Sequence, residues 1–338
     1  MTETINVLLT IPFNEQVVAK LAAVSPQIAI HQRDARKPEE IADIIKDIDV
    51  LYTFSALPMP EDAPRLRWVQ MHTAGVDNIL DHPLYTNSEV MFTTTSGIHV
   101  VQMAEYVFGM ILAFAHKIPQ MLEDQKAAEW PEKKFERYRP NELYGATLGI
   151  IGYGSIGRQV AQIGQAFGMR VVAVKSDMRN LKLDRFILPN TGDPDGVIPD
   201  RYYPIKALKA FLTECDFVVV TLPLTDATHH LITAKALEAM KPSAVLINVA
   251  RGDIIDEEAL VHALHGGKIG GAALDVFNQE PLPADSPLWK LPNTIISPHI
   301  SGNSLHYDER SADVFAENLR RFLAEKPLVN LVERGRDY

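Results

Sequence analysis

The sequence has little of several residue types, and each shortage excludes a class of protein. Its 338 residues contain one cysteine, Cys215, so neither a disulfide within the chain nor a cysteine-rich metal site can form. This cysteine precedes the apolar run 217–220, so we expect a buried and unreactive thiol. Basic residues number 33 against 43 acidic ones, and the net charge of −10 argues against a nucleic-acid-binding surface.

Long apolar runs are also missing. A membrane-spanning helix needs roughly 20 apolar residues, whereas the longest candidate is 107–115. Residues 1–6 have neither the basic segment nor the apolar core of a signal peptide. We therefore expect a cytoplasmic protein without a membrane partner. The one basic cluster, Lys133-Lys134 with Arg137 and Arg139, is interleaved with acids and is typical of a solvated surface.

Length and patterning indicate two α/β domains. At roughly 100–200 residues per domain, a chain of this length predicts two. Apolar runs alternate with helical patterns in both halves, which is typical of parallel sheets. The predicted strands of the first half are 5–10, 27–31, 50–54, 66–71 and 90–95, with helices at 15–24 and 38–46. The predicted strands of the second half are 148–151, 171–174, 217–221, 244–248, 272–275 and 294–297.

Four other segments complete the expected organisation. The helix 100–117 is apolar nearly all round, so it belongs in a core or a subunit interface. Residues 123–140 are expected to form a polar connector, and residues 190–204, rich in Pro, Gly and Asp, an inserted surface loop. The amphipathic helix 307–323 is expected to return the chain to the first domain, with a hinged cleft between the domains. The predicted domains are a substrate-binding domain of residues 1–101 and 303–338 and a dinucleotide-binding domain of residues 102–302.

One stretch has the pattern of a dinucleotide-binding turn. The predicted strand 148–151 leads into Gly152-Tyr-Gly-Ser-Ile-Gly157, and a helix is expected at 158–167. At this spacing Gly152 permits a tight turn, Gly154 lets the backbone approach a ligand, and Gly157 lets the helix pack closely on the strand. The strand, turn and helix together direct backbone N–H groups and the positive end of the helix at one point, which suits a pyrophosphate.

Three residues that follow later strands carry possible chemistry. Arg251, Glu280 and His299 each lie just past a predicted strand, and ligands of parallel sheets bind outside the carboxyl ends of the strands. An arginine can hold a carboxylate through two hydrogen bonds, and a histidine can transfer a proton near neutral pH. A glutamate can orient that histidine. Beside a nicotinamide, this set fits hydride transfer to or from a 2-oxo or 2-hydroxy acid, although position alone also fits ordinary surface turns.

Five segments in order resemble the signatures of the D-isomer-specific 2-hydroxyacid dehydrogenase family. They are Gly145–Gly157, Thr221–Thr228, Met240–Gly252, Gly271–Leu282 and Ser297–Gly302. The resemblance implies two doubly wound parallel-sheet α/β domains, one a Rossmann domain and the other a smaller, flavodoxin-like substrate domain. It also implies an NAD(P)-dependent oxidoreductase that acts on a small 2-oxo or 2-hydroxy acid. The helix from Val100 then resembles part of the family's dimer interface, so we expect a homodimer.

The resemblance also implies roles for individual residues. His299 matches the family's acid/base histidine, Glu280 its carboxylate partner and Arg251 its substrate-orienting arginine. The segment 74–77 matches the loop that holds the substrate carboxylate through the backbone of Ala74, Gly75 and Val76. No metal is expected among these residues. The cofactor-binding residues that the resemblance implies are Gly152, Tyr153, Gly154, Ser155, Ile156, Gly157, Lys175, Ser176, Arg179, Leu222, Pro223, Thr228, Val249, Ala250, Arg251, Asp275, His299 and Gly302.

One departure from the family pattern concerns the choice of cofactor. Members that prefer NAD carry an acid at the end of the second strand, where it binds the ribose hydroxyls. This chain has Lys175 there, followed by Ser176 and with Arg179 close by. Because these residues attract a 2′-phosphate, we expect a preference for NADP(H). In the alternative, Asp177 binds the ribose hydroxyls and NAD(H) is used.

The side chain of the substrate is not determined by the sequence. Glyoxylate or hydroxypyruvate reduction is the first expectation, since NADPH suits a reductive role, and branched or aromatic 2-oxo acids come next. The alternative from another class is a catalytically silent, dinucleotide-binding regulatory protein on the same fold. The joint presence of Arg251, Glu280 and His299 argues against that alternative.

Overall fold

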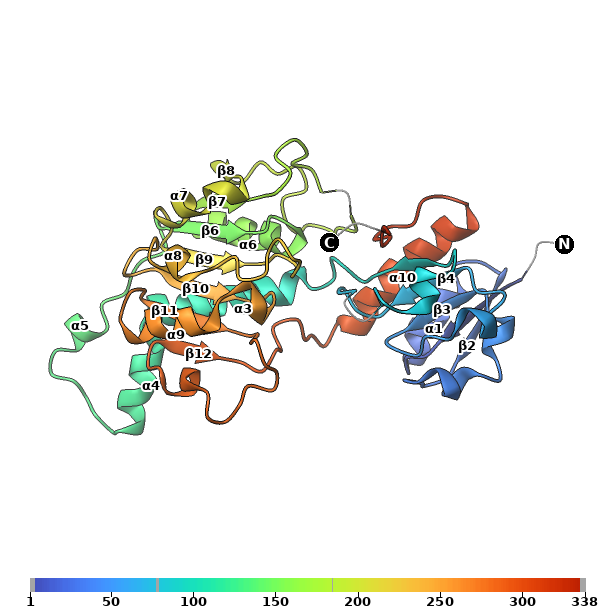
Figure 1. Ribbon diagram of the computed structural model, residues 1–338, viewed down its shortest axis with the longest axis horizontal. Coiled ribbons are helices and arrows are strands. Elements are labelled where there is room, and N and C mark those ends of the chain that lie inside the picture. Colours follow the sequence, from blue (N-terminus) through green and yellow to red (C-terminus); the bar gives the residue numbers. More distant parts are fainter. Residues whose placement is uncertain (1–3, 77–78, 184, 335–338) are drawn as a thin grey trace. The chain divides into compact units, whose positions relative to one another are not determined.

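The computed structural model describes residues 4–76, 79–183 and 185–334, which form two compact units (Figure 1). One unit comprises residues 4–98, 185–188 and 304–334, and the other comprises residues 99–183 and 189–303. Each contains its own parallel sheet and hydrophobic core. The predicted class, two parallel-sheet α/β folds, is confirmed. Asp77, the last residue of the predicted loop 74–77, lies outside the described residues.

The smaller unit has a five-stranded sheet in the order β2-β1-β3-β4-β5, which is the flavodoxin-like order. Its strands are β1 (Ile5–Leu9), β2 (Ile28–Gln32), β3 (Val50–Thr53), β4 (Trp68–Met71) and β5 (Met91–Thr93). All neighbouring pairs are parallel, and each strand lies within two residues of its predicted bounds. Helices α1 (Glu15–Ala22) and α10 (Tyr307–Leu323) share one core cluster with the sheet. The short helix α2 (Pro83–Thr86) packs in the other cluster.

The helix predicted at 38–46 is wrong. The segment forms two 3₁₀ helices, Pro38–Ile41 and Ile45–Asp47. Three isoleucines, Ile41, Ile45 and Ile48, are buried there, and β-branched residues lose side-chain freedom in an α-helix. Two short turns are therefore enough to bury the apolar side chains that produced the helical pattern.

The larger unit has a seven-stranded parallel sheet in the order β12-β11-β10-β9-β6-β7-β8. Its strands are β6 (Thr147–Ile151), β7 (Arg170–Val174), β8 (Arg201–Tyr203), β9 (Phe217–Val220), β10 (Val245–Asn248), β11 (Gly271–Leu274) and β12 (Thr294–Ile296). The order reverses between β6 and β9, and this switch point is where doubly wound sheets bind nucleotides. Figure 1 shows the strands stacked in this sequence.

Strand β8 corrects the sequence-based prediction of a loop at 190–204. Arg201–Tyr203 pairs in parallel with β7 and extends the sheet from the six predicted strands to seven. The strand is short, and of its three residues only Tyr203 is buried. An edge strand of this kind lacks the apolar run that identifies a central strand, because a neighbour covers only one side.

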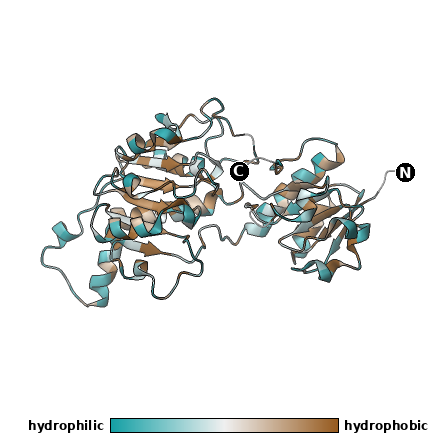
Figure 2. Cartoon of the chain, in the orientation of Figure 1, coloured by the Kyte–Doolittle hydropathy of each residue, from teal (hydrophilic) through white to brown (hydrophobic). Residues whose placement is uncertain are grey.

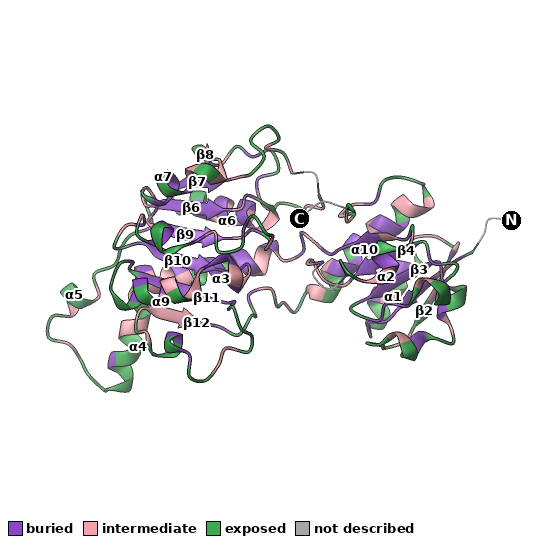
Figure 3. Ribbon diagram, in the orientation of Figure 1, coloured by how far each residue is buried: buried purple, intermediate pink, exposed green. Residues whose placement is uncertain are grey.

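Helices cover both faces of the larger sheet. Side chains of β9 alternate, so that Phe217 and Val219 join one core cluster while Val218 and Val220 join the other. The first cluster contains residues of α3 (Val100–Ala115) and α6 (Ser155–Ala166). The second contains residues of α7 (Leu208–Leu212), α8 (Ala234–Leu237) and α9 (Glu257–His265). Figures 2 and 3 show the resulting hydrophobic, buried strands between these helices.

An exposed arm follows α3. The predicted polar connector at 123–140 is partly helical, because it includes the end of α4 (Ile118–Lys126) and all of α5 (Lys134–Arg137). Asp124 ties the arm together by accepting two hydrogen bonds of 2.6 Å from the guanidinium of Arg137. In the part of the chain described here, no helix is both long and apolar enough to cross a bilayer.

Candidate active site

The glycine turn after β6 has the geometry that its spacing predicts. Gly152 has a φ of +99°, and a Cβ there would lie 2.8 Å from the backbone nitrogen of Leu222. A Cβ at Gly157 would lie 2.4 Å from the carbonyl oxygen of Gly152, so the helix is packed directly on the turn. At Gly154 a Cβ would meet none of the described residues within 4 Å. Among the same residues no side chain caps α6, which leaves its N-terminal N–H groups to a ligand such as a pyrophosphate.

Tyr153, inside the turn, directs its side chain into the protein. The ring is buried, and its hydroxyl donates a 2.7 Å hydrogen bond to Asp193. Burial, then the hydrogen bond to Asp193, raise the pKa of this hydroxyl well above its usual range. Arg158, also buried, donates to the backbone carbonyls of Asp193 and Leu181. The inserted segment is therefore fastened to α6, and Tyr153 has only its backbone to offer a cofactor.

The end of β7 presents the residues on which the prediction of cofactor preference depends. Lys175 is half-buried, and its backbone donates to Tyr203 of β8. Ser176 and Arg179 are exposed. Asp177 accepts a 2.9 Å hydrogen bond from the backbone N–H of Arg179, so one of its carboxylate oxygens shapes this turn.

The turn after β9 is held by Thr228. Its hydroxyl donates a 2.8 Å hydrogen bond to the carbonyl of Pro223 and accepts one of 2.8 Å from the backbone of Thr225. The side chain is buried, as is that of Leu222, whereas Pro223 is exposed. Thr228 thus fixes the path of the segment that the resemblance places beside the cofactor.

Arg251 is positioned by a residue that the sequence analysis missed. Asn248, the last residue of β10, is buried; its side chain accepts from the backbone of Ala250 and donates to the carbonyl of Arg251. Val249 and Ala250 are buried, while the half-exposed Arg251 side chain donates a 2.8 Å hydrogen bond to the Ala250 carbonyl. The available signal was an amide at the end of an apolar strand, where only a hydrogen-bonded role makes it stable.

The loops after β10 and β11 are in direct contact. A Cβ at Gly252 would lie 2.0 Å from the backbone of Phe277, so only glycine fits between them. Phe277 in turn donates its N–H to Oε1 of Glu280 at 3.1 Å. The other oxygen of Glu280 lies 2.7 Å from Nδ1 of His299. The predicted pair of His299 and Glu280 therefore forms. It lies where the loops after three neighbouring strands of one sheet meet.

Asp275 organises the loop that carries His299. It is fully buried, its carbonyl accepts the N–H of His299, and its carboxylate accepts those of Ile300 and Ser301, each at 2.9 Å. The Ser297 hydroxyl donates to the same carboxylate. These bonds hold His299 in a left-handed conformation with φ of +52°, an uncommon state for a residue other than glycine. The side chain of His299 remains about half exposed, at 49%.

Helix α3 stabilises the same loop through two of its side chains. The hydroxyl of Tyr106 lies 2.6 Å from that of Ser297, and the amide of Gln102 donates to the carbonyl of Gly302 at 3.0 Å. Burial raises the pKa of the Tyr106 hydroxyl above its ordinary value of 10.0. Neither residue was predicted, because a helix distant in sequence gives no sign of which loop it contacts.

The loop expected to bind the substrate carboxylate belongs to the smaller unit. Ala74, Gly75 and Val76 follow β4, and the Gly75 carbonyl accepts a 2.9 Å hydrogen bond from the hydroxyl of Thr73. Val76 is buried, while Ala74 and Gly75 are partly exposed. The loop thus lies at the carboxyl end of a parallel strand, and its role in binding substrate stays a prediction.

A doubly wound sheet with a glycine turn at its switch point and a hydrogen-bonded histidine–glutamate pair at its carboxyl edge defines a dinucleotide-dependent oxidoreductase. Comparison with known proteins identifies the family. Residues 108–301 match the D-isomer specific 2-hydroxyacid dehydrogenase, NAD binding domain. The chain belongs to this family of D-isomer specific 2-hydroxyacid dehydrogenases.

Similar proteins extend the match to nearly the whole chain. The glyoxylate reductase of Korarchaeum cryptofilum is 35% identical over 302 residues, which cover 87% of this chain and 85% of the relative. A D-isomer specific 2-hydroxyacid dehydrogenase family protein from Aeromonas salmonicida matches with a TM-score of 0.78 and 35% identity, covering 98% of this chain and 99% of that one. An NADPH-dependent glyoxylate/hydroxypyruvate reductase from Sinorhizobium meliloti, solved with NADP and sulfate, has a TM-score of 0.74 and 27% identity, covering 98% of each.

Proposed function

We propose that the protein reduces a small 2-oxo acid to the D-2-hydroxy acid, with NADPH as the preferred hydride donor. The observation that carries this proposal is the 2.7 Å contact between His299 and Glu280 at the carboxyl edge of the dinucleotide-binding sheet. A histidine held by a carboxylate through one ring nitrogen leaves the other nitrogen to exchange a proton with substrate.

The residues of this chain divide the work of the reaction. The nicotinamide supplies the hydride when the cofactor is bound. Arg251 binds the substrate carboxylate and polarises the neighbouring carbonyl group. His299 donates a proton from Nε2 to the carbonyl oxygen as the hydride reaches the carbon, so the carbonyl becomes a hydroxyl. Glu280 holds the ring through Nδ1, which fixes the direction in which Nε2 points.

Glyoxylate and hydroxypyruvate are the proposed substrates. Relatives that share about a third of the sequence are named glyoxylate reductases, and they cover most of this chain. The test is a panel of 2-oxo acids assayed by NADPH oxidation, with glyoxylate, hydroxypyruvate, and branched and aromatic 2-oxo acids. We expect the two small acids to have the highest kcat/KM. A higher value for an aromatic acid would contradict the substrate assignment, and no oxidation with any acid would contradict the reaction.

The preference for NADP(H) is supported by the cationic end of β7. Ser176 and Arg179 are exposed there, and Asp177 already uses one oxygen to bind the Arg179 backbone. In Arg179→Gln we expect KM for NADPH to rise about tenfold, with little change for NADH, because an arginine–phosphate contact contributes roughly 1.5–3 kcal/mol. Lys182→Gln, which removes another exposed cation of the same segment, is the matched control. Equal kcat/KM values for NADH and NADPH in the unaltered enzyme would contradict the preference.

A homodimer is proposed from the arm that follows α3. Trp130 and Phe135 are each 83% exposed and Tyr144 is 82% exposed, and aromatic residues are enriched at interfaces. Much of α3 itself is buried in its own unit, so the arm offers more free apolar surface than the helix. Light scattering after gel filtration should give twice the chain mass, and Trp130→Glu with Phe135→Glu should shift it towards the monomer. Val197→Glu, at a position that is 77% exposed, is the control. A cytoplasmic location stays a prediction.

A further inference from the structure

Two segments outside the proposed catalytic residues are locked together by their backbones. His230 donates its N–H to the carbonyl of Asp253 at 2.7 Å, and Ile232 donates to that of Ile254 at 3.0 Å. Asp256 completes the ladder by donating to Ile232 at 3.1 Å. Ile232 and Ile254 are fully buried, so the ladder is anchored in the core. The backbone positions from which the side chains of this ladder project are therefore fixed relative to one another.

Three such side chains form a compact cluster. One nitrogen from each of His229 and His230 and one carboxylate oxygen of Asp253 all lie within 4.8 Å of one another. The two imidazole rings are stacked, with centroids 4.1 Å apart and an angle of 22° between their planes. His229 is exposed, and the other two are partly exposed, so an ion can enter from solvent. His230 has a φ of +48°, an uncommon state for histidine that the ladder maintains.

We propose that His229, His230 and Asp253 form a binding site for a divalent transition-metal ion of the zinc class. Two imidazole nitrogens and one carboxylate oxygen are a ligand set for zinc, nickel or cobalt, whereas calcium and magnesium prefer oxygen ligands alone. Metal–nitrogen bonds of roughly 2.0–2.1 Å place tetrahedral ligand atoms about 3.3 Å apart. Small side-chain rotations bring the cluster to that spacing, and water completes the coordination shell.

The site is distinct from the proposed catalytic pair. Asp253 belongs to the 3₁₀ helix Gly252–Ile254, next to Arg251, whereas His299 and Glu280 follow other strands. Its existence does not depend on the proposed reaction. The number of cysteines in the sequence could not reveal this site, because its ligands are histidines and an aspartate. The fold brings them together although more than twenty residues of sequence separate the histidines from the aspartate.

The experiment is calorimetric titration of untagged, chelator-treated protein with Zn²⁺, Ni²⁺ and Mg²⁺ at pH 7.5. We expect a Zn²⁺ or Ni²⁺ site with a stoichiometry of one per chain and a Kd on the order of micromolar, and no comparable Mg²⁺ site. Binding should weaken about tenfold or more on lowering the pH to 5.5, because imidazoles must be deprotonated to coordinate.

Variants identify the ligands. His229→Ala, His230→Asn and Asp253→Asn should each weaken Zn²⁺ binding at least about tenfold. Asparagine is chosen at position 230 because it tolerates the left-handed conformation, and His230→Gly serves if that variant fails to fold. His262→Ala removes an exposed histidine that lies beside one acid, Glu258, and should leave the affinity unchanged. Equal affinity in the unaltered protein and in His229→Ala, or no one-to-one binding at all, would overturn the proposal.

Discussion

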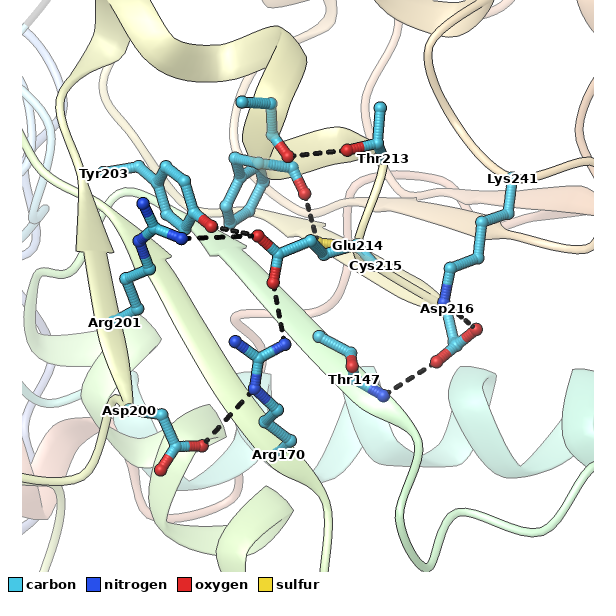
Figure 4. A network of polar contacts seen from close by, with 12 residues as sticks. Thr147, Arg170, Asp200, Arg201, Tyr203, Thr213, Glu214, Cys215, Asp216 and Lys241 are labelled. Atoms are coloured by element: carbon cyan, nitrogen blue, oxygen red, sulfur yellow. Dashed lines mark hydrogen bonds and ion pairs between the residues drawn. The ribbon is translucent and has the colours of Figure 1, made fainter.

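The seven-stranded sheet has an amino edge, where its strands begin, and a carboxyl edge, where its strands end. Polar residues are used in opposite ways at these two edges. At the amino edge, shown in Figure 4, charged side chains satisfy one another. Arg170 at the start of β7 donates to Glu214 at 2.7 Å, and the hydroxyl of Tyr203 donates to the same carboxylate. Asp216, just before β9, accepts from Lys241 at 2.7 Å and from the backbone of Thr147 at 2.8 Å. The charged groups of this edge pair with one another, and their side chains are partly exposed.

At the carboxyl edge, internal hydrogen bonds position groups that stay accessible to a ligand. Asn248 and Asp275 are buried and bind the backbone, whereas Arg251 is partly exposed and Glu280 and His299 are exposed. The uncapped start of α6 lies at the same edge. At this edge the buried polar residues bind the backbone, and the exposed ones are those proposed to act on the substrate. Substitutions at the two edges should therefore separate activity from stability.

The largest effect is expected from His299→Asn. Loss of the group that donates the proton should lower kcat by about 10²–10⁴-fold. Asparagine tolerates the left-handed backbone of this position, so the loop should keep its shape and the dissociation constant for NADPH should change little. Steady-state kinetics and fluorescence titration with NADPH measure the two quantities. An unchanged kcat would exclude His299 as the proton donor.

Arg251→Lys should have the next largest effect. Lysine keeps the charge but cannot form two parallel hydrogen bonds to a carboxylate. Loss of that contact should lower kcat/KM about 10–100-fold, mainly through KM for the oxo acid. Measurements with saturating cofactor separate this effect from cofactor binding. Should KM for NADPH rise while that for the oxo acid stays constant, Arg251 would be a cofactor residue instead.

Glu214→Gln addresses the amino edge and should affect stability alone. Hydrogen bonds from Tyr203, then from Arg170, hold the pKa of Glu214 below its ordinary value of 4.5. Its ionised form therefore stabilises the folded state above that value, and this contribution is lost as the pH falls through the lowered pKa. At pH 7 we expect a loss of about 1 kcal/mol and a Tm lower by about 2–4 °C.

Thermal unfolding at pH 7 and pH 3 tests this sign. The difference between Glu214→Gln and the unaltered protein should be smaller at pH 3 than at pH 7, while kcat at pH 7 stays within about twofold of its normal value. Glu258→Gln, at an exposed position of α9, is the control and should shift Tm little at either pH. A larger Tm difference at pH 3 than at pH 7 would refute the assignment.

The smallest effect concerns Cys215, which borders the same network (Figure 4). Burial raises the pKa of its thiol to about 12, and the sulfur donates to the carbonyl of Phe211 at 3.1 Å. Ellman's reagent should therefore modify the native protein very slowly at pH 8 and should titrate one thiol after denaturation. Rapid modification of the native protein would contradict the burial.

Candidate site residues that directly follow a predicted strand were predictable from the sequence. The glycine turn and the Arg251, Glu280 and His299 positions are fixed by the strand that precedes each one, so a linear pattern locates them. The central strands were also predictable, because burial on both faces leaves a continuous apolar run. The pairing of His299 with Glu280 followed from the shared edge on which parallel strands end.

Residues that act across the fold could not be predicted in the same way. Asn248, Tyr106 and Gln102 position catalytic loops through hydrogen bonds whose partners no periodicity indicates. Asp275 was expected among the cofactor-binding residues, and its bonds to the His299 loop emerge only when β11 and β12 are placed side by side. The edge strand β8 and the two 3₁₀ turns escaped prediction because short elements carry too little pattern.

At the position of His299, selection for folding stability and selection for catalysis favour different residues. A left-handed residue other than glycine costs on the order of 1 kcal/mol or more, and here that residue is the proposed proton donor. A lineage released from the need to reduce its substrate would gain folding stability by replacing this histidine. Relatives that keep the fold without the chemistry are therefore expected to carry asparagine or glycine at this position, and their melting temperatures should exceed those of the active enzymes.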